Sequence, residues 1–184
     1  MKAQSITSLK SFFLMAMPNL QDPYFMHSLV YVHQHDEKGA TGFIINKPTN
    51  VTIADVLDRM KLQSDNTDLV VRPTLLGGPV SQEQVFLITH EKASTAPEAI
   101  HLTYSIESLS EVIAAHSTQE ALFFLGYAQW EGGQLEAEIA ANGWLIVPYN
   151  NDILFHLPFI SRYDAAASLI GIDMLHLSSD VGHG

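Results

Sequence analysis

The sequence contains no cysteine among its 184 residues. This absence excludes disulfide scaffolds, Cys-ligated zinc sites, iron–sulfur clusters and thiol nucleophiles together. Long hydrophobic runs are also lacking, since no stretch approaches the roughly 20 apolar residues of a membrane-spanning helix. The apolar run at residues 12–17, closed by Pro18, is too short for the core of a signal peptide. We therefore expect a cytoplasmic protein that does not associate with membranes.

Basic residues are scarce, and residues 93–184 contain only one of them, Arg162. The same half of the chain carries eleven acidic residues, and the net charge of the whole chain is −11. Nucleic-acid binding depends on Lys and Arg neutralising phosphates, so this chain is expected to repel a polyanion. We expect no direct contact with nucleic acid, and we expect any macromolecular partner to be a protein.

The length and composition indicate one globular domain over residues 1–184. Hydrophobic residues make up 47% of the chain and charged residues 16%, which is far from the composition of disordered proteins. A chain of this length buries enough surface to fold without a disulfide or metal staple.

Hydrophobic periodicity predicts strands interspersed with a few helices. The expected strands lie at 12–17, 28–35, 42–46, 72–76, 85–90, 121–125 and 145–148. The expected helices lie at 53–62, 106–116, from Gly133 to a stop at Asn142, and at 160–170. Loops are expected at 63–70 and 91–98, and a hairpin-like connection is expected between 72–76 and 85–90. Antiparallel hairpins mixed with strand–helix units indicate an α+β fold, with the helices packed against one irregular sheet.

Two helices carry more detailed signals. Thr52 and Asp55 have the spacing of a capping box at the start of the helix 53–62. In the last helix, the pattern predicts four inward-facing positions. These are Ile160, Tyr163, Ala167 and Ile170.

Residues 126–145 gather two tryptophans, three acids and a paired glycine, which raises the question of a binding site. A helix beginning at Gly133 would present free backbone N–H groups to an anion, but the glycines also explain a close approach of chain and sheet. Glu136 and Glu138 are two residues apart, so they point to different sides of a helix and do not form a catalytic pair. Trp144 is expected to pack in the core.

The nine histidines raise the question of a metal site. His33 and His35 are expected on one face of the strand 28–35, beside Asp36, but two ligands are too few and no HExxH pattern supplies others. A Gly-x-Ser-x-Gly elbow is also absent from the sequence. We therefore predict no metal site, no cofactor and no catalytic residue.

Motifs spread over nearly the whole chain carry a family resemblance. They are Leu14–Pro18, Asp22–Phe25, His35 with Gly39, Ala40 and Gly42, Ile45–Pro48, Gly77–Val80, Gly126–Trp130, Gly133–Ile139, Trp144-Leu145 and the tail Val181–His183. Together they resemble the YqgE/AlgH family of bacterial proteins. The resemblance implies a compact α+β domain whose mixed, mostly antiparallel sheet curls into a pseudo-barrel with helices outside. It implies no established reaction, although some members are labelled transcriptional regulators.

Because catalytic motifs are missing, the sequence favours a non-enzymatic regulatory or protein-interaction domain, acting through a protein partner rather than on DNA. The alternative is a small-molecule-binding protein or enzyme whose pocket lies near Asn46, Gly77-Gly78 and the helix start at Gly133. The candidate ligand-binding residues are His35, Asn46, Lys47, Gly77, Gly78, Gly133, Gln134 and Glu136. The alternative requires four polar residues to lie within roughly 12 Å of one another, since they must reach one ligand. These are His35, Asn46, Gln134 and Glu136.

Overall fold

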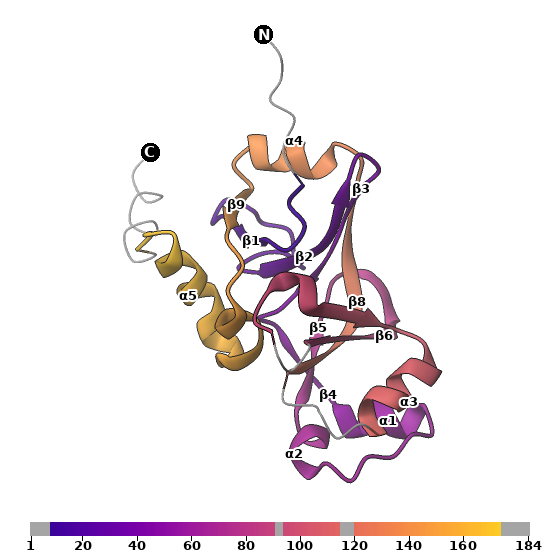
Figure 1. The fold of residues 1–184 in the computed structure, drawn as a ribbon. Helices are drawn as coiled ribbons and strands as arrows, with labels where there is room; N and C mark the ends of the chain where they lie inside the picture. Colours follow the sequence, from indigo (N-terminus) through magenta and orange to yellow (C-terminus); the bar gives the residue numbers. More distant parts are fainter. Residues whose placement is uncertain (1–7, 91–93, 115–119, 174–184) are drawn as a thin grey trace.

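The computed structural model describes residues 8–90, 94–114 and 120–173. In these residues nine strands form one sheet (Figure 1). The strands are β1 (Phe13–Ala16), β2 (Leu29–Asp36), β3 (Gly39–Ile44), β4 (Pro48–Thr52), β5 (Pro73–Leu76), β6 (Val80–His90), β7 (Ile100–Thr103), β8 (Ala121–Glu131) and β9 (Trp144–Val147). The helices are α1 (Ile53–Arg59), α2 (Thr67–Val70), α3 (Ile106–Ala114), α4 (Gln134–Ala140) and α5 (Arg162–Leu169), with short turns η1 (Pro97–Ala99), η2 (Asp152–His156) and η3 (Phe159–Ser161).

The strand order is β4-β5-β8-β3-β2-β1-β9, with β6 and β7 joined to it through β8. Every pair is antiparallel except β5 with β8. The long strand β8 pairs with β5 and β6 through residues 121–127 and with β3 through residues 128–131. This change of partners along one strand curls the sheet. The expected α+β fold, a mostly antiparallel sheet curled into a pseudo-barrel and flanked by helices, is confirmed.

Helices cover both faces of the sheet, so a central strand is buried on both sides. All four residues of β1 are buried for this reason. Successive strand side chains point to opposite faces. Phe13 and Met15 therefore join the core beneath η2 and α5, while Leu14 and Ala16 join the core beneath α4. A third core lies under α1, α2 and α3 at the lower end of Figure 1.

The helices are short, and α3 is the longest with nine residues. Figure 1 shows α4 at the upper end, α5 along one side and α1–α3 together at the lower end. Among the described residues, none of the helices has the length and apolar character needed to cross a membrane.

Several expected boundaries are wrong for identifiable reasons. The strand β4 begins at Pro48, where we expected a strand to end, because proline is tolerated at the first position of an edge strand. Strand β7 was not expected at all, and the expected loop 63–70 contains the single turn α2, capped by Asn66. The expected hairpin between β5 and β6 does not form, because both strands pair with β8 instead.

The helix signals are partly confirmed. The capping box of Thr52 and Asp55 is present, although α1 ends at Arg59 rather than at residue 62. The expected inward position of Ile160 is wrong, since this side chain is 87% exposed. It lies in η3, before α5 begins, so the helical spacing does not reach it. Tyr163 and Ala167 are buried as expected. The tail motif at 181–183 and the last two residues of the expected helix 106–116 lie outside the described residues.

Candidate ligand-binding site

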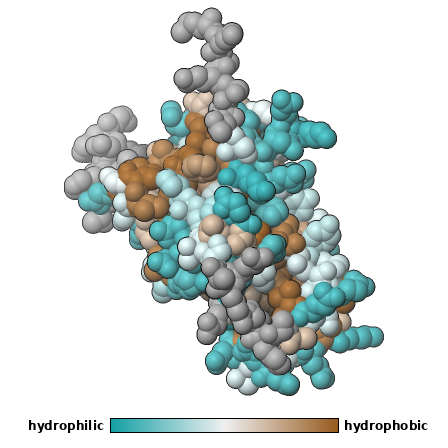
Figure 2. Space-filling model, viewed as in Figure 1, coloured by the Kyte–Doolittle hydropathy of each residue, from teal (hydrophilic) through white to brown (hydrophobic). Residues whose placement is uncertain are grey.

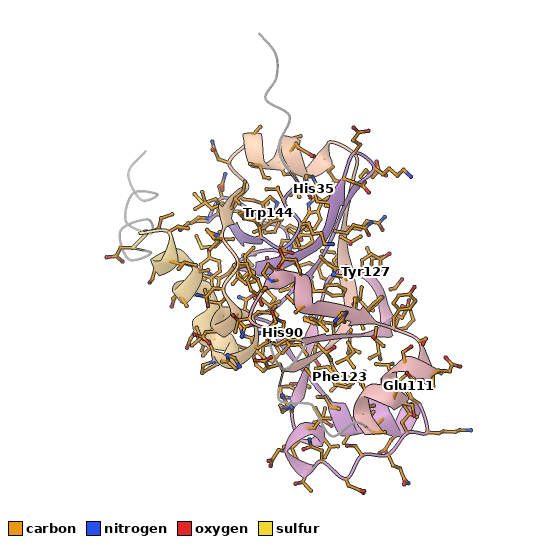
Figure 3. The ribbon with its side chains drawn as sticks, in the orientation of Figure 1. His35, His90, Glu111, Phe123, Tyr127 and Trp144 are labelled. Carbon is orange, nitrogen blue, oxygen red and sulfur yellow. The ribbon has the colours of Figure 1, made fainter. Side chains whose placement is uncertain are left out.

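His35 and Glu136, two of the predicted residues, contact each other, with Glu136 on α4. Figure 3 shows His35 below α4. His35 Nε2 lies 2.9 Å from Oε1 of Glu136, and His35 Nδ1 accepts a 2.9 Å hydrogen bond from the backbone N–H of Leu9. Nδ1 must be unprotonated to accept this hydrogen bond, so Nε2 carries the hydrogen and donates a hydrogen bond to Glu136. His35 is 8% exposed. Both ring nitrogens therefore form hydrogen bonds within the protein.

The turn into α4 holds two more of the predicted residues. Gly133 immediately precedes the helix with a left-handed φ of 79°, as expected for its helix start. The side chain of Gln134 accepts a 3.0 Å hydrogen bond from the backbone N–H of Glu131 and donates one of 3.0 Å to Glu138. These contacts order the turn from β8 into α4.

Asn46 and Lys47 hold the start of β2 in place. Asn46 Oδ1 accepts a 2.8 Å hydrogen bond from the N–H of Leu29, and Asn46 Nδ2 donates one of 2.9 Å to the carbonyl of His27. The Lys47 ammonium donates to the carbonyl of Tyr24. Burial lowers the pKa of Lys47, and the nearby carboxylate of Asp22 acts in the opposite direction.

The structure does not bring Asn46 and His35 together. Asn46 binds Leu29 at the first residue of β2, whereas His35 lies six residues further along the same strand. At a rise of about 3.3 Å per residue, this places them about 20 Å apart. The four polar residues therefore do not line one pocket, and a ligand-binding role for any of them stays a prediction.

Gly77 and Gly78 lie where β5 crosses close to β8. The Gly77 carbonyl accepts a 2.8 Å hydrogen bond from the N–H of Ile44, and its own N–H donates one of 3.0 Å to the carbonyl of Leu125. A Cβ atom on Gly77 would lie 2.1 Å from the Gly126 carbonyl oxygen, and one on Gly78 would lie 2.3 Å from Tyr127 backbone atoms. The close approach of the two backbones explains both glycines.

The two histidines expected on one face of β2 are in fact separated. The pairing of β2 with β3 shifts register between Val32 and Gln34, which is the mark of a β-bulge at His33. The bulge turns His33 towards Phe43, with a ring separation of 6.4 Å, while His35 faces α4. Within the described ranges, no three His, Asp or Glu side chains gather as metal ligands.

The bulge directs His33 into a hollow of about 570 Å³, which we call the tyrosine hollow. Pockets for small organic molecules span about 300–1,000 Å³. The N-terminal segment 8–12, β2, the segment around η1 and the end of β9 together form its walls. Its principal polar lining residues are Lys10, Ser11, Tyr31, His33, Glu98 and Tyr149. None of the eight predicted ligand-binding residues lines this hollow.

The two tyrosines of the hollow are held in their protonated form. Burial raises the pKa of Tyr31, against a hydrogen bond from Ser11 that lowers it, and the charge of Glu98 raises it further. Burial also raises the pKa of Tyr149, with further contributions from Tyr31 and from nearby carboxylates. The Tyr149 hydroxyl donates a 2.8 Å hydrogen bond to Oδ1 of Asn151, so its oxygen remains available as an acceptor.

His33, which lines the hollow from the same strand as Tyr31, is held neutral. Burial lowers the pKa of its imidazole, and the positive charge of Lys10 lowers it further. At neutral pH this ring therefore offers one donor and one acceptor and carries no charge. Two protonated phenols and a neutral imidazole are suited to hydrogen-bonding a neutral molecule.

The backbone beside Tyr31 is strained. Ser11 has φ 67°, which is uncommon for a residue other than glycine. Its N–H donates a 2.8 Å hydrogen bond to the carbonyl of Val32, and its side chain lies near enough to Tyr31 to lower the pKa of that phenol. Such conformations persist only where the surrounding structure fixes them, and they are concentrated at ligand sites.

The chain is similar to known proteins in both sequence and fold. A family model described as AlgH-like (DUF179) matches residues 13–175. The chain belongs to the AlgH-like family. A UPF0301 protein from Chromobacterium violaceum is 44% identical over 182 residues, which cover 96% of this chain and 97% of that protein. A UPF0301 protein from Coxiella burnetii is 43% identical over 175 residues, covering 95% and 96%.

Solved structures agree with this assignment. The solution structure of the AlgH protein from Pseudomonas aeruginosa matches with a TM-score of 0.77 and 35% identity over 100% of both chains. A crystal structure of a protein from Corynebacterium diphtheriae matches with a TM-score of 0.67 over 91% of this chain and 90% of that one. Its identity is 17%, so it shows a likeness of fold alone. The resemblance found in the sequence motifs is confirmed, and the names of these relatives state no reaction.

Proposed function

We propose that this AlgH-like protein is a non-enzymatic regulatory protein of the cytoplasm, which binds a small neutral molecule in the tyrosine hollow and acts on a protein partner. The observation that carries the proposal is the set of neutral polar side chains that line this hollow beside the oppositely charged Lys10 and Glu98. Tyr31 is 1% exposed and protonated, Tyr149 is protonated, and His33 is neutral. A volume of about 570 Å³ accommodates an ordinary metabolite.

The lining indicates the chemistry of the ligand. Phe12, Ile100 and the two tyrosine rings supply apolar wall. The Tyr149 oxygen and the carboxylate of Glu98 offer hydrogen-bond acceptors. A matching ligand is therefore mostly apolar and carries at least one O–H or N–H donor, as a phenol or an aromatic amine does.

A role in ligand binding explains the raised pKa values of Tyr31 and Tyr149 better than a catalytic role does. A tyrosine nucleophile or base needs a lowered pKa. Burial moves both tyrosines of the hollow in the opposite direction, away from the phenolate. The same burial supplies rigid aromatic walls, because Tyr31 packs edge-on against Phe13 and Tyr149 at ring separations of 6.1 and 6.4 Å.

An apolar surface supports the proposed protein partner. Figure 2 shows apolar surface gathered in the upper left of the view, where Figure 1 draws α5 and β9. Ile146 on β9 is 37% exposed and Leu169 on α5 is 46% exposed. Contiguous apolar surface on a soluble domain is typical of interaction sites. With a net charge of −11, a protein is a more suitable partner than nucleic acid.

A thermal-shift screen with small phenols and aromatic amines tests the proposal. A ligand at 100 times its dissociation constant should stabilise the protein by about 2.7 kcal/mol. Tyr149→Phe removes the acceptor oxygen and should lower the affinity for a compound found in the screen roughly tenfold. Tyr104→Phe is the matched control, because Tyr104 is 59% exposed and does not line the hollow. Equal weakening by both variants, or by neither, would contradict binding in the tyrosine hollow, and turnover of a bound compound would favour the enzyme alternative.

A further inference from the structure

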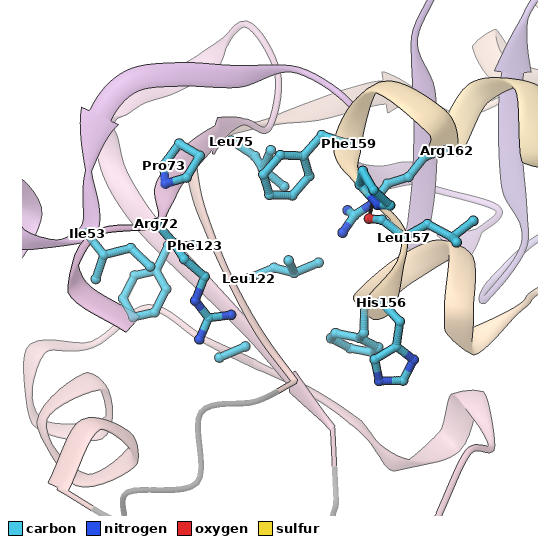
Figure 4. A pocket seen from close by; sticks show the side chains of 13 residues that line it. Ile53, Arg72, Pro73, Leu75, Leu122, Phe123, His156, Leu157, Phe159 and Arg162 are labelled. Carbon is cyan, nitrogen blue, oxygen red and sulfur yellow. Dashed lines mark hydrogen bonds between the residues drawn. The ribbon is translucent and has the colours of Figure 1, made fainter. Parts of the chain in front are cut away.

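A second hollow, which we call the arginine hollow, lies between β5, the first residues of β8 and the segment from η2 to α5 (Figure 4). Its volume is about 230 Å³, and it shares no lining residue with the tyrosine hollow. The walls are mostly apolar, with Leu122, Phe123 and Phe155 among them. Three side chains that can carry positive charge also line it, namely Arg72, His156 and Arg162.

Arg162 is the unusual member of this lining, because its charge is buried without a counterion. The residue is 1% exposed. Its guanidinium donates to two carbonyls, at 2.8 Å to Ile45 and at 3.1 Å to Leu157, and stacks 4.6 Å from the ring centre of Phe159. In the part of the chain that the structure describes, no carboxylate forms an ion pair with it. Burial lowers the pKa of Arg162 to about 10, which still leaves it charged at neutral pH.

A buried charge that lacks a counterion is costly, and carbonyl dipoles offset only part of that cost. An anion placed in the hollow beside Arg162 would offset more of it. The guanidinium is planar and delocalised, and its fork of N–H donors matches the two oxygens of a carboxylate. The charge of Arg162 therefore favours an anionic group in this hollow.

Arg72 supplies a second positive charge to the same hollow. Burial lowers its pKa, while the carboxylate of Asp68 acts in the opposite direction. Figure 4 shows the guanidinium groups of Arg72 and Arg162 on different sides of Leu122, with His156 at a third position around the hollow. Two of only nine basic residues thus converge on one hollow, in a chain whose net charge is −11.

We propose that the arginine hollow binds the carboxylate of a small organic acid with an apolar body. This site is separate from the tyrosine hollow and goes beyond the function proposed above. Arg162 and Arg72 contact the carboxylate, and the phenylalanine walls contact the apolar body. At about 30 Å³ per water, 230 Å³ is the space of roughly eight waters, which suits an acid of the size of benzoate.

The rim of the hollow explains why a single negative charge is preferred. His156 lies 2.9 Å from both Glu120 and Asp152, and Glu120 also contacts His90 at 3.0 Å. A phosphate dianion would bring a second charge close to these carboxylates. A monoanionic carboxylate meets the two arginines with less repulsion.

The test has to separate binding from folding, because Arg162 also ties the η2–α5 segment to the end of β3. Substitution of Arg162 risks unfolding the protein through loss of the Ile45 and Leu157 contacts. Arg72→Gln is the better variant, since Arg72 lines the hollow and is only partly buried. Arg59→Gln is its matched control, because it removes the same charge from an exposed position outside the hollow.

The experiment is a titration of the full-length protein with benzoate, followed by backbone amide NMR. We expect saturable shifts confined to the lining of the arginine hollow, binding weakened roughly tenfold or more by Arg72→Gln, and unchanged binding in Arg59→Gln. Absence of saturable shifts, or equal affinity in Arg72→Gln and the wild type, would overturn the proposal. Tighter binding of inorganic phosphate than of benzoate would overturn the choice of a carboxylate. Weakening by Tyr149→Phe would place the acid in the tyrosine hollow and would also overturn it.

Discussion

The indole Nε1 of Trp144 donates a 2.8 Å hydrogen bond to Oε2 of Glu138, and the same oxygen accepts one of 3.0 Å from Nε1 of Trp130. Both tryptophans are 2% exposed. Phe25 packs against both indoles, at ring separations of 5.7 and 5.5 Å. The expected core position of Trp144 is confirmed. Glu138 and the two tryptophans of the segment 126–145 therefore hold α4 onto the sheet.

Glu138→Leu should destabilise the protein by about 2–6 kcal/mol. The substitution leaves two buried indole N–H groups without an acceptor, and each such group costs about 1–3 kcal/mol. Urea unfolding followed by tryptophan fluorescence measures the effect directly. Glu131→Leu is the control, because Glu131 is exposed and its side chain does not contact the indoles. Equal losses in the two variants would show that Glu138 has no special role.

His35→Leu should free the N-terminal segment from β2. The imidazole is the acceptor for the N–H of Leu9 at 2.9 Å, and leucine offers no acceptor. We expect a loss of about 1–3 kcal/mol together with faster hydrogen exchange of the Leu9 amide.

Glu136→Gln provides the contrast to His35→Leu. Its side-chain oxygen can still accept from Nε2 of His35, so the tautomer and the Leu9 hydrogen bond are retained. Protection of the Leu9 amide should therefore survive in Glu136→Gln. If this amide exchanges at the same rate in both variants, His35 does not anchor the segment.

The pKa of His33 predicts a dependence of stability on pH. Burial and Lys10 lower this pKa in the folded state, so below about pH 6.5 the unfolded chain binds more protons at this position than the folded one. Stability then rises with pH, and it is lost on acidification from about pH 6.5 downwards. In His33→Asn, urea unfolding at a series of pH values should show a shallower loss of stability below about pH 6.5. An unchanged slope would contradict a depressed pKa.

Features set by a few neighbouring residues could be predicted from the sequence, whereas features set by distant contacts could not. The capping box of Thr52 needs only Asp55, and it is present as predicted. The bulge at His33 depends on how β2 pairs with β3, so strand alternation alone placed His33 and His35 on one face. The tyrosine hollow draws its walls from four separate segments. In the sequence, Tyr31 was only part of the expected strand 28–35, and Tyr149 directly followed the expected strand 145–148.

The same distinction applies to the glycines, which were equivalent turn signals in the sequence. A Cβ atom on Gly77 would lie 2.1 Å from the Gly126 carbonyl oxygen, whereas one on Gly133 would meet nothing within 4 Å. Gly77→Ala must therefore push two paired backbones apart, and we expect a loss of about 3 kcal/mol or more.

Gly133→Ala should cost only the strain of its left-handed φ of 79°, about 1–2 kcal/mol. Urea unfolding of both variants gives the comparison. The Gly77 N–H is hydrogen-bonded to Leu125, so the two backbones cannot move apart freely. Equal losses of unfolding free energy in the two variants would contradict this close contact.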